Sequence, residues 1–336
     1  MYGAYGLIKE GLPIDYFLEP RGKRETLFKK FLYFFEKPVT LLLKLGMPHE
    51  VVLCHKDRFQ HVSQVVCIND AISLAVLFWK WMGWVHSDVI TLFQSLPERR
   101  LAYFRNSLFR VWAISGLLAQ AKKIMVLSSS AKYELAKTFH IPLEKISVFY
   151  FGVDRDFWSY KPMVSEERRY LLSVGNDMNR DYSTLVQALN DTYETIFVTK
   201  KPIKSVSAVV KSGLSNGELR NLYQKARLVV IPSVKLLTES SGLSTTLQAM
   251  SCGTPVLVSD SLPMRELFKE NEHVFYYEPE NPRSLRSALE RIWNDPAALE
   301  RVSANGRNLV EEKYNSGHMT EQLRSILELT SSRNPH

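Results

Sequence analysis

Hydroxyl side chains gather around a glycine in one stretch of the sequence, Pro232 to Asp260. The stretch is PSVKLLTESSGLSTTLQAMSCGTPVLVSD, and its pattern predicts a strand end, a loop around Gly242, a helix from about Ser244 and a strand after Gly253. Backbone N–H groups at a helix start lack partners and, together with the helix dipole, favour an anion. The stretch therefore predicts an anion site beside several hydroxyl donors.

The side chains of this stretch suit two interpretations. Thr245 and Thr246 can donate hydrogen bonds to an anion, and Gln248, about one turn further along, can bind a sugar hydroxyl. Alternatively, Ser244 is the N-cap of an ordinary helix, because serine and threonine are common caps. The residues alone leave both interpretations open.

The same stretch resembles the donor-binding signature of the large retaining glycosyltransferase family with the GT-B fold, glycosyl transferases group 1. Three further segments resemble that family in matching order: the interdomain crossover at 146–158, the first strand and helix of the donor domain at 171–189, and the helix and strand before the signature at 214–233. The resemblance implies an α/β protein of two Rossmann-like, doubly wound domains that face a cleft.

The resemblance also implies a function and a set of site residues. We expect transfer of a hexose from a nucleoside-diphosphate sugar to an acceptor hydroxyl, on a glycan or a lipid-linked molecule, with retention of configuration. The second domain is expected to bind the donor through Arg180, Asn176, Lys200, Ser241, Gly242, Ser244, Thr245, Thr246 and Gln248. Glu239 is expected to contact the sugar as a catalytic residue. In the family the leaving diphosphate is thought to deprotonate the acceptor, so no strong protein base is required.

Some positions depart from the family's pattern. The family has two glutamates eight residues apart, whereas here Glu239 and Gln248 are 248 − 239 = 9 apart and the second is an amide, which carries no charge. The family's arginine and lysine after the donor-domain strand correspond to Asn176 and Arg180. Arg180 can still bind a diphosphate bidentately. Lys200 can replace the lost cation, or it can belong to a solvated basic loop end.

Two polar residues at predicted strand ends are candidates in the amino-terminal half. Asp70 follows VVCIN and Gln94 ends ITLFQ. In the family a polar group at such a strand end contacts the transferred sugar, so both are expected as catalytic residues. Asp70 can equally cap the following helix. The family's first strand and Gly-rich loop are not visible, and we expect that strand to be missing.

Metal binding is not expected, nor is any cofactor beyond the donor substrate. Asp154 and Asp156 form the Asp-x-Asp pattern that binds metal in the other major glycosyltransferase fold. This short pattern often arises by chance, and here it lies within the predicted crossover. Helix dipole and cations are therefore expected to balance the diphosphate charge.

Basic and large apolar residues alternate in residues 21–46, RGKRETLFKKFLYFFEKPVTLLLKLG. This composition is typical of a helix that lies on an anionic membrane. The resemblance adds that members with lipid-linked acceptors often use this region in that way. The alternative is an ordinary amphipathic helix that packs on its own domain.

Short apolar runs alternate with helical stretches along the chain, which predicts parallel sheets in both halves. The Pro-containing segment DFWSYKPMVSEE interrupts the alternation. We therefore expect an acceptor-side domain over 1–160, a nucleotide-sugar-binding domain over 161–315, and a helix over 316–336 that packs back on the first domain.

Composition restricts the class of protein. The 336 residues contain 43 Lys and Arg against 35 Asp and Glu, a net charge of +8 that suits an anionic partner. No basic–aromatic nucleic-acid motif is visible, so nucleic acid is not expected. Three widely spaced cysteines favour a reducing compartment. Neither a secretory signal nor an apolar run of about 20 residues is visible, so we expect a cytoplasmic protein, peripheral on the membrane.

Two other functions stay open at this point. One is a different GT-B enzyme, such as a sugar-nucleotide epimerase, which would need carboxylates and a histidine around the sugar. The other is a non-catalytic subunit that binds a sugar nucleotide. Gln248, Asn176 and the missing first strand favour the second.

Overall fold

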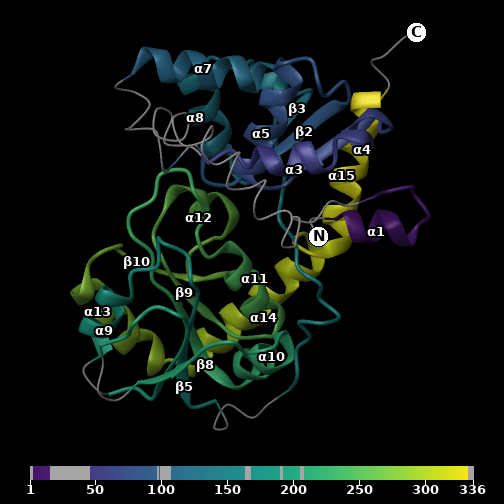
Figure 1. The fold of residues 1–336 in the computed structure, drawn as a ribbon. Coiled ribbons are helices and arrows are strands. Elements are labelled where there is room, and N and C mark those ends of the chain that lie inside the picture. Colours follow the sequence, from purple (N-terminus) through teal and green to yellow (C-terminus); the bar gives the residue numbers. More distant parts are fainter. Residues whose placement is uncertain are drawn as a thin grey trace. The chain divides into compact units, whose positions relative to one another are not determined.

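The computed structural model describes residues 3–15, 46–96, 98, 107–162, 168–189, 192–204 and 208–331. The chain divides into two compact units, Met1–Phe149 with Thr320–His336, and Tyr150–Met319. Each unit has its own parallel sheet, as Figure 1 shows.

In the first unit, the described strands form a parallel sheet in chain order, β1-β2-β3-β4. The strands are β1 (Gln64–Cys67), β2 (Asp88–Phe93), β3 (Lys123–Val126) and β4 (Ile146–Val148). The helices are α1 (Ala4–Lys9), α3 (His49–Cys54), α4 (Lys56–Gln60), α5 (Asp70–Trp81), α7 (Leu108–Ala119) and α8 (Ser129–Phe139), with the 3-10 turn η1 (Leu143–Lys145). Almost every residue of β2 is buried, as expected for a parallel strand covered on both faces.

In the second unit, the described strands form a parallel sheet of order β10-β9-β8-β5-β6-β7. The strands are β5 (Tyr170–Val174), β6 (Thr195–Val198), β7 (Val209–Lys211), β8 (Ala226–Ile231), β9 (Val256–Ser259) and β10 (Phe275–Tyr277). The helices are α9 (Tyr182–Leu189), α10 (Asn216–Lys225), α11 (Leu243–Ser251), α12 (Leu262–Leu267), α13 (Pro282–Trp293) and α14 (Pro296–Glu312). A further helix, α15 (Ser316–Ser331), begins in this unit and continues into the first from Thr320. This order is doubly wound, and the direction of winding reverses between β5 and β8.

Apolar side chains of β5 and β8 fill both faces of the second sheet. Leu172 and Val229 belong to one buried cluster, whereas their neighbours Leu171 and Leu228 belong to another. Successive side chains of a strand point to opposite faces. The continuous apolar runs of the sequence therefore become strands that are buried on both sides.

Helix ends in the second unit follow the signals in the sequence. Ser215 and Glu218 form a capping box at the start of α10, and Asn281 and Asp295 cap α13 and α14 just before their first prolines. The chain thus leaves α13 at Trp293 and enters α14 at Pro296. These caps fix where the helices that cover the sheet begin.

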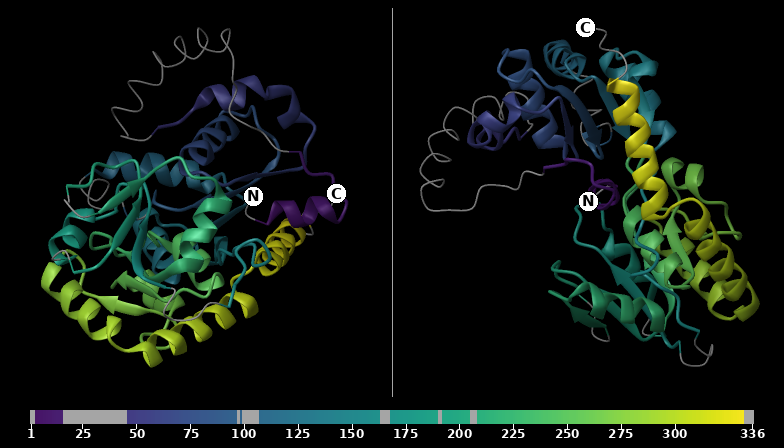
Figure 2. Two further views of the ribbon diagram at one scale, coloured as in Figure 1. Left: turned by 90° about the horizontal axis from the view of Figure 1, so that it is seen from below. Right: turned by 90° about the vertical axis from the view of Figure 1, so that its right-hand side faces the viewer.

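The compact units divide after Phe149, earlier than the expected boundary at residue 160. The crossover packs on the second unit because Val153 N–H donates to Tyr314 O at 2.9 Å, and the Trp158 ring lies 5.8 Å from that of Tyr223. Thr320, near the start of α15, donates to Gly3 O in the first unit, and Figure 2 shows α1 beside α15. Further along α15, the Gln64 side chain donates to Leu327 O at 3.0 Å.

No helix in the described ranges is long and apolar enough to cross a membrane. The basic and aromatic stretch 21–46, expected to lie on a membrane, falls outside the described residues except for Gly46. Its predicted role stays a prediction.

Candidate functional site

The loops that follow β5 and β8 meet at the point where the sheet reverses its winding. Arg180 and Ser233 form an antiparallel bridge. Asp181 N–H donates to Pro232 O at 3.1 Å, and Val234 N–H donates to Asn179 O at 3.0 Å. This is a non-hydrogen-bonded pair, so the Arg180 and Ser233 side chains lie on the same face. Ligands of doubly wound sheets bind at such a reversal, beyond the carboxyl ends of the strands.

The start of α11 lies in the loop region after β8 and has no side-chain cap. Its N-cap is Gly242, at φ +86°, rather than Ser244 as the alternative interpretation had it. Leu243 N–H donates to Ser240 O at 3.1 Å and Thr246 N–H to Gly242 O at 2.8 Å. Within the described part of the chain, the N–H groups of Ser244 and Thr245 have no acceptor. Two uncompensated donors at the positive end of a helix form an anion site.

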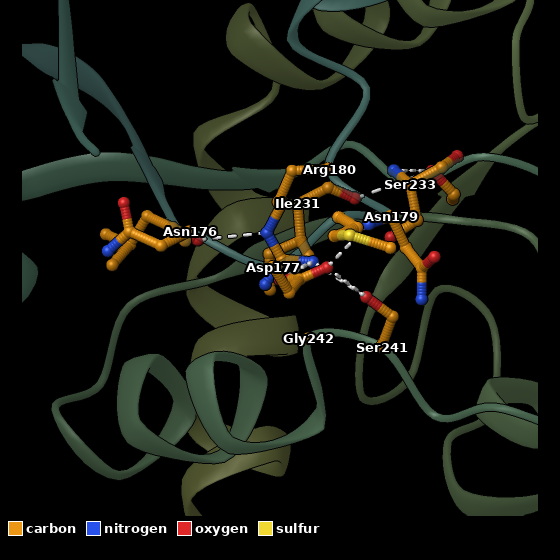
Figure 3. Close-up of polar contacts among 12 residues, drawn as sticks. Asn176, Asp177, Asn179, Arg180, Ile231, Ser233, Ser241 and Gly242 are labelled. Carbon is orange, nitrogen blue, oxygen red and sulfur yellow. Dashed lines mark hydrogen bonds and ion pairs between the residues drawn. The ribbon is translucent and has the colours of Figure 1, made fainter. Parts of the chain in front are cut away.

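Arg180 lies beside this helix start but is largely occupied by the protein. Only 2% of its side chain is exposed. Its Nε donates to Val174 O and its Nη1 to Ser241 Oγ, each at 3.1 Å, as Figure 3 shows. Nη2 has no hydrogen-bond partner among the described residues. Arg180 can therefore offer a ligand one edge of its guanidinium, while the rest of the group organises the loops.

The hydroxyls predicted to bind the donor differ in availability. Thr246 is fully buried, and its Oγ1 donates to Gly242 O at 3.0 Å within the helix. The Thr245 hydroxyl bonds to that of Tyr223. Ser241 Oγ accepts from Arg180 and donates to Asp177 at 3.0 Å. Ser244 is exposed, and its hydroxyl makes no hydrogen bond to other described residues, so it is available to a ligand.

Glu239 precedes the start of α11 in the sequence, and Gln248 lies within the helix. Tyr223 Oη donates to Gln248 Oε1 at 3.3 Å, and burial raises the pKa of Tyr223 well above its usual range, which keeps this donor protonated. Gln248 thus offers a ligand its amide N–H₂ rather than its carbonyl. Glu239 is half-buried in the loop between β8 and α11.

Asn176 and Lys200 connect the ends of β5 and β6. Asn176 Oδ1 accepts from Lys200 N–H at 2.6 Å and from Thr199 Oγ1 at 3.3 Å. Lys201 Nζ donates to Arg180 O at 3.2 Å. Lys200 is exposed, and its ammonium makes no hydrogen bond or ion pair to other described residues. Of these two lysines, Lys200 is the cation available to a bound anion.

In the first unit, Asp70 and Gln94 are held in a shared network. Asp70 accepts from Gln94 N–H at 2.8 Å and from Ser95 N–H at 3.0 Å, while Gln94 Nε2 donates to Ile68 O at 3.1 Å. Asn69, not Asp70, caps α5. These bonds join the ends of β1 and β2. The catalytic roles predicted for Asp70 and Gln94 stay predictions.

Asp154 of the Asp-x-Asp pattern caps a turn. Its Oδ1 accepts from Asp156 N–H at 3.1 Å and from Phe157 N–H at 3.0 Å. The residues described include no cluster of three or more side chains that could hold a metal ion.

Buried polar groups that sequence reasoning missed surround the same helix start. Ser233 and Ser240 are 4% and 8% exposed, and neither Oγ atom has a hydrogen-bond partner in the described residues. Asn179 Nδ2 is likewise buried and without a partner. Asp177, also missed, bonds to Ser241. The signal for Ser233 was its place directly after a predicted strand; nothing in the sequence singled out Ser240 within its run of hydroxyls.

Part of the chain resembles a known protein family, and its fold resembles solved structures. Residues 203–309 match the family model "Glycosyl transferases group 1". The chain has the fold of sucrose-phosphate synthase from Thermosynechococcus elongatus, with a TM-score of 0.70 at 17% identity over 85% of this chain and 79% of that one. The chain therefore has the GT-B fold, and residues 203–309 resemble the glycosyl transferases of group 1. The predicted fold class is confirmed.

Other relatives agree with this assignment. The chain is 28% identical over 201 residues to the O-antigen chain mannosyltransferase RfbU of Salmonella typhimurium, a match that covers 55% of this chain and 54% of RfbU. It thus spans about half the length of that curated relative. The fold also matches Anabaena HepE in complex with UDP and glucose, with a TM-score of 0.68 at 12% identity over 83% of this chain and 81% of HepE.

Proposed function

We propose that this protein transfers a hexose from a nucleoside-diphosphate sugar to an acceptor hydroxyl, with retention of configuration. The observation that carries the proposal is the uncapped start of α11 at the reversal between β5 and β8, where Ser244 and Thr245 N–H groups lack acceptors among the described residues. A diphosphate suits such a helix start. The HepE structure, of the same fold, contains UDP and glucose.

Different residues around the helix start bind different groups of the donor in this proposal. Ser244 and Thr245 N–H groups, with Lys200 and the free edge of Arg180, bind the diphosphate. Glu239 and the Gln248 amide bind hydroxyls of the sugar and ribose. Fixed donors at the leaving diphosphate stabilise the charge that develops as the glycosidic bond breaks. The leaving oxygen then takes the acceptor's proton, so no protein base is needed.

The donor's charge is balanced without a metal ion in this proposal. The helix dipole, Lys200 and Arg180 supply positive charge at the diphosphate. Asp154, the remaining candidate ligand, already caps a turn through two backbone N–H groups. Nucleotide binding is therefore expected to persist in excess EDTA. A complete loss that Mg²⁺ or Mn²⁺ restores would contradict metal independence.

The acceptor is proposed to be a glycan or a lipid-linked molecule. The name of RfbU, an O-antigen chain mannosyltransferase, supports a glycan-building role. The basic and apolar stretch 21–46 supports a membrane-bound acceptor and a peripheral location.

The experiment that tests the function is a sugar-nucleotide screen. Purified protein is incubated with UDP-, GDP- and ADP-hexoses, with and without glycan acceptors, and release of the nucleoside diphosphate is measured. One donor is expected to be consumed slowly alone and faster with an acceptor. Absence of consumption for every donor, while one nucleoside diphosphate still binds, would instead establish the second candidate function.

That second candidate is a non-catalytic protein that binds a sugar nucleotide. It is favoured by Gln248, which stands where the family has a glutamate and whose carbonyl is bound to Tyr223. It is also favoured by the extensive occupation of Arg180 within the protein.

A further inference from the structure

Asp177 joins the loop after β5 to the loop that starts α11. Its Oδ1 accepts from Ser241 Oγ at 3.0 Å and from Asn179 N–H at 3.1 Å, and its Oδ2 lies 3.4 Å from Arg180 Nη1. Arg180 Nη1 also donates to Ser241 Oγ. Asp177, Arg180 and Ser241 therefore form a closed triangle of polar contacts, drawn in Figure 3.

Two glycines leave space for the guanidinium within this triangle. A Cβ on Gly175 would lie 2.3 Å from Arg180 Nε, and one on Gly242 would lie 3.1 Å from Nη1. Both glycines have positive φ, +150° and +86°. The guanidinium thus fits against bare backbone on two sides, and its position relative to Gly242, the N-cap of α11, is fixed.

Charge explains why an aspartate belongs in the triangle. Arg180 places a positive charge beside the positive end of α11, which is unfavourable. The Asp177 carboxylate, whose side chain is 35% exposed, offsets that charge. The same carboxylate lies 3.0 Å from Ser241, next to the N-cap Gly242, so it would repel an anion bound at the start of α11. Asp177 therefore has two opposing effects on an anion: it orders the helix start and it repels the ligand.

We propose that Asp177 is a positioning residue, which holds the free N–H groups of α11 in place through Ser241 and Arg180. The inference rests on the proposed function, because it assigns those N–H groups to the diphosphate of a nucleotide sugar. Asp177→Asn keeps an oxygen that accepts from Ser241 and Asn179 but removes the negative charge. Asp177→Ala removes both.

The two substitutions are expected to change affinity in opposite directions. In calorimetric titrations with UDP, GDP and ADP, Asp177→Asn should bind the preferred nucleotide about three- to tenfold more tightly than the parent, because the repulsion is gone. Asp177→Ala should bind about tenfold more weakly, because the loop is no longer held. Asp181→Asn is the control: it removes the same charge nearby, but among the described residues the Asp181 carboxylate accepts hydrogen bonds from Thr184 alone.

A second measurement tests positioning without any ligand. Amide hydrogen exchange over residues 240–245 should be faster in Asp177→Ala than in the parent and unchanged in Asp177→Asn. Equal exchange in all three proteins would overturn the inference whether or not a nucleotide binds. The inference would also be overturned if Asp177→Asn and Asp177→Ala weakened nucleotide binding equally. It would be overturned as well if Asp177→Asn and Asp181→Asn tightened binding equally. If the parent binds none of the nucleotides, the proposed function fails, and the exchange result still decides the role of Asp177.

Discussion

The Gln248 side chain has one group bonded within the protein and one group available to a ligand. Its carbonyl is bound to Tyr223, whose raised pKa keeps the hydroxyl protonated at neutral pH, so only the amide N–H₂ is free to meet the donor. A charged partner for the sugar must then come from Glu239. The sequence identified some of the polar groups near the helix start, but not how each of them is hydrogen-bonded.

Glu239→Gln should therefore lower turnover more than it lowers nucleotide affinity. Glutamine retains a hydrogen-bonding side chain of the same size, but it cannot carry the charge that favours the transition state. We expect kcat to fall about a hundredfold and the Kd for the bare nucleoside diphosphate to change less than about threefold. Steady-state kinetics and calorimetry check this. Equal losses in both would assign Glu239 to the nucleotide instead of the sugar.

Replacing Gly242 should lower the stability of the protein. Gly242→Ala places a Cβ 2.5 Å from Ile231 Cγ2 at a φ of +86°, so strain and overlap combine to destabilise the protein by about 3 kcal/mol. Gly213→Ala is the matched control, with φ +70° but open space, and should cost about 1 kcal/mol. Urea unfolding of the two variants measures the difference, and equal costs would show that Gly242 has room for a side chain.

At the scale of elements, α11 is the part of the fold that the site depends on most. It begins at a glycine and has no acidic residue in its first turn, so its positive end is left for a ligand. A carboxylate placed there would stabilise the helix by about 0.3–1 kcal/mol. The same carboxylate would compete with a diphosphate for the free N–H groups.

Ser244→Asp should accordingly separate stability from binding. Ser244 is exposed at the second helical position, so the substitution should leave the melting temperature unchanged or raise it. Nucleoside-diphosphate affinity should fall about tenfold or more. Ser244→Ala, the neutral control, should cost less than about threefold, as only one hydroxyl is lost. If Ser244→Asp binds as the parent does, the diphosphate does not lie at α11.

The sequence predicted most of the elements and a smaller part of the site. The strands with continuous apolar runs were found because burial on both faces gives them a clear pattern. β7, three exposed residues at Val209–Lys211, was missed because it has no such pattern. Arg180 was placed at the site, but its burial depends on Gly175 and Gly242, which both lie against its side chain although they are far apart in the sequence. Such long-range packing leaves no local signal, which is also why Asp177 was missed.

At the scale of the whole molecule, the order of strands in the second unit decides where a ligand can bind. The reversal between β5 and β8 brings the two following loops together, and the uncapped helix α11 starts in the second of them. The net charge of +8 favours an anionic partner for the chain as a whole. The proposed nucleotide-sugar donor would therefore bind at this edge of the second sheet.

Hydrogen exchange with and without nucleotide tests that claim most directly. The full chain is exchanged alone and with saturating UDP, GDP or ADP, and protection is mapped by peptide. For the nucleotide that binds, the account predicts slower exchange over residues 175–181 and 240–246, which carry the loop after β5 and the start of α11. Protection confined to other segments, or no protection with any of the three nucleotides, would contradict a donor site at this helix start.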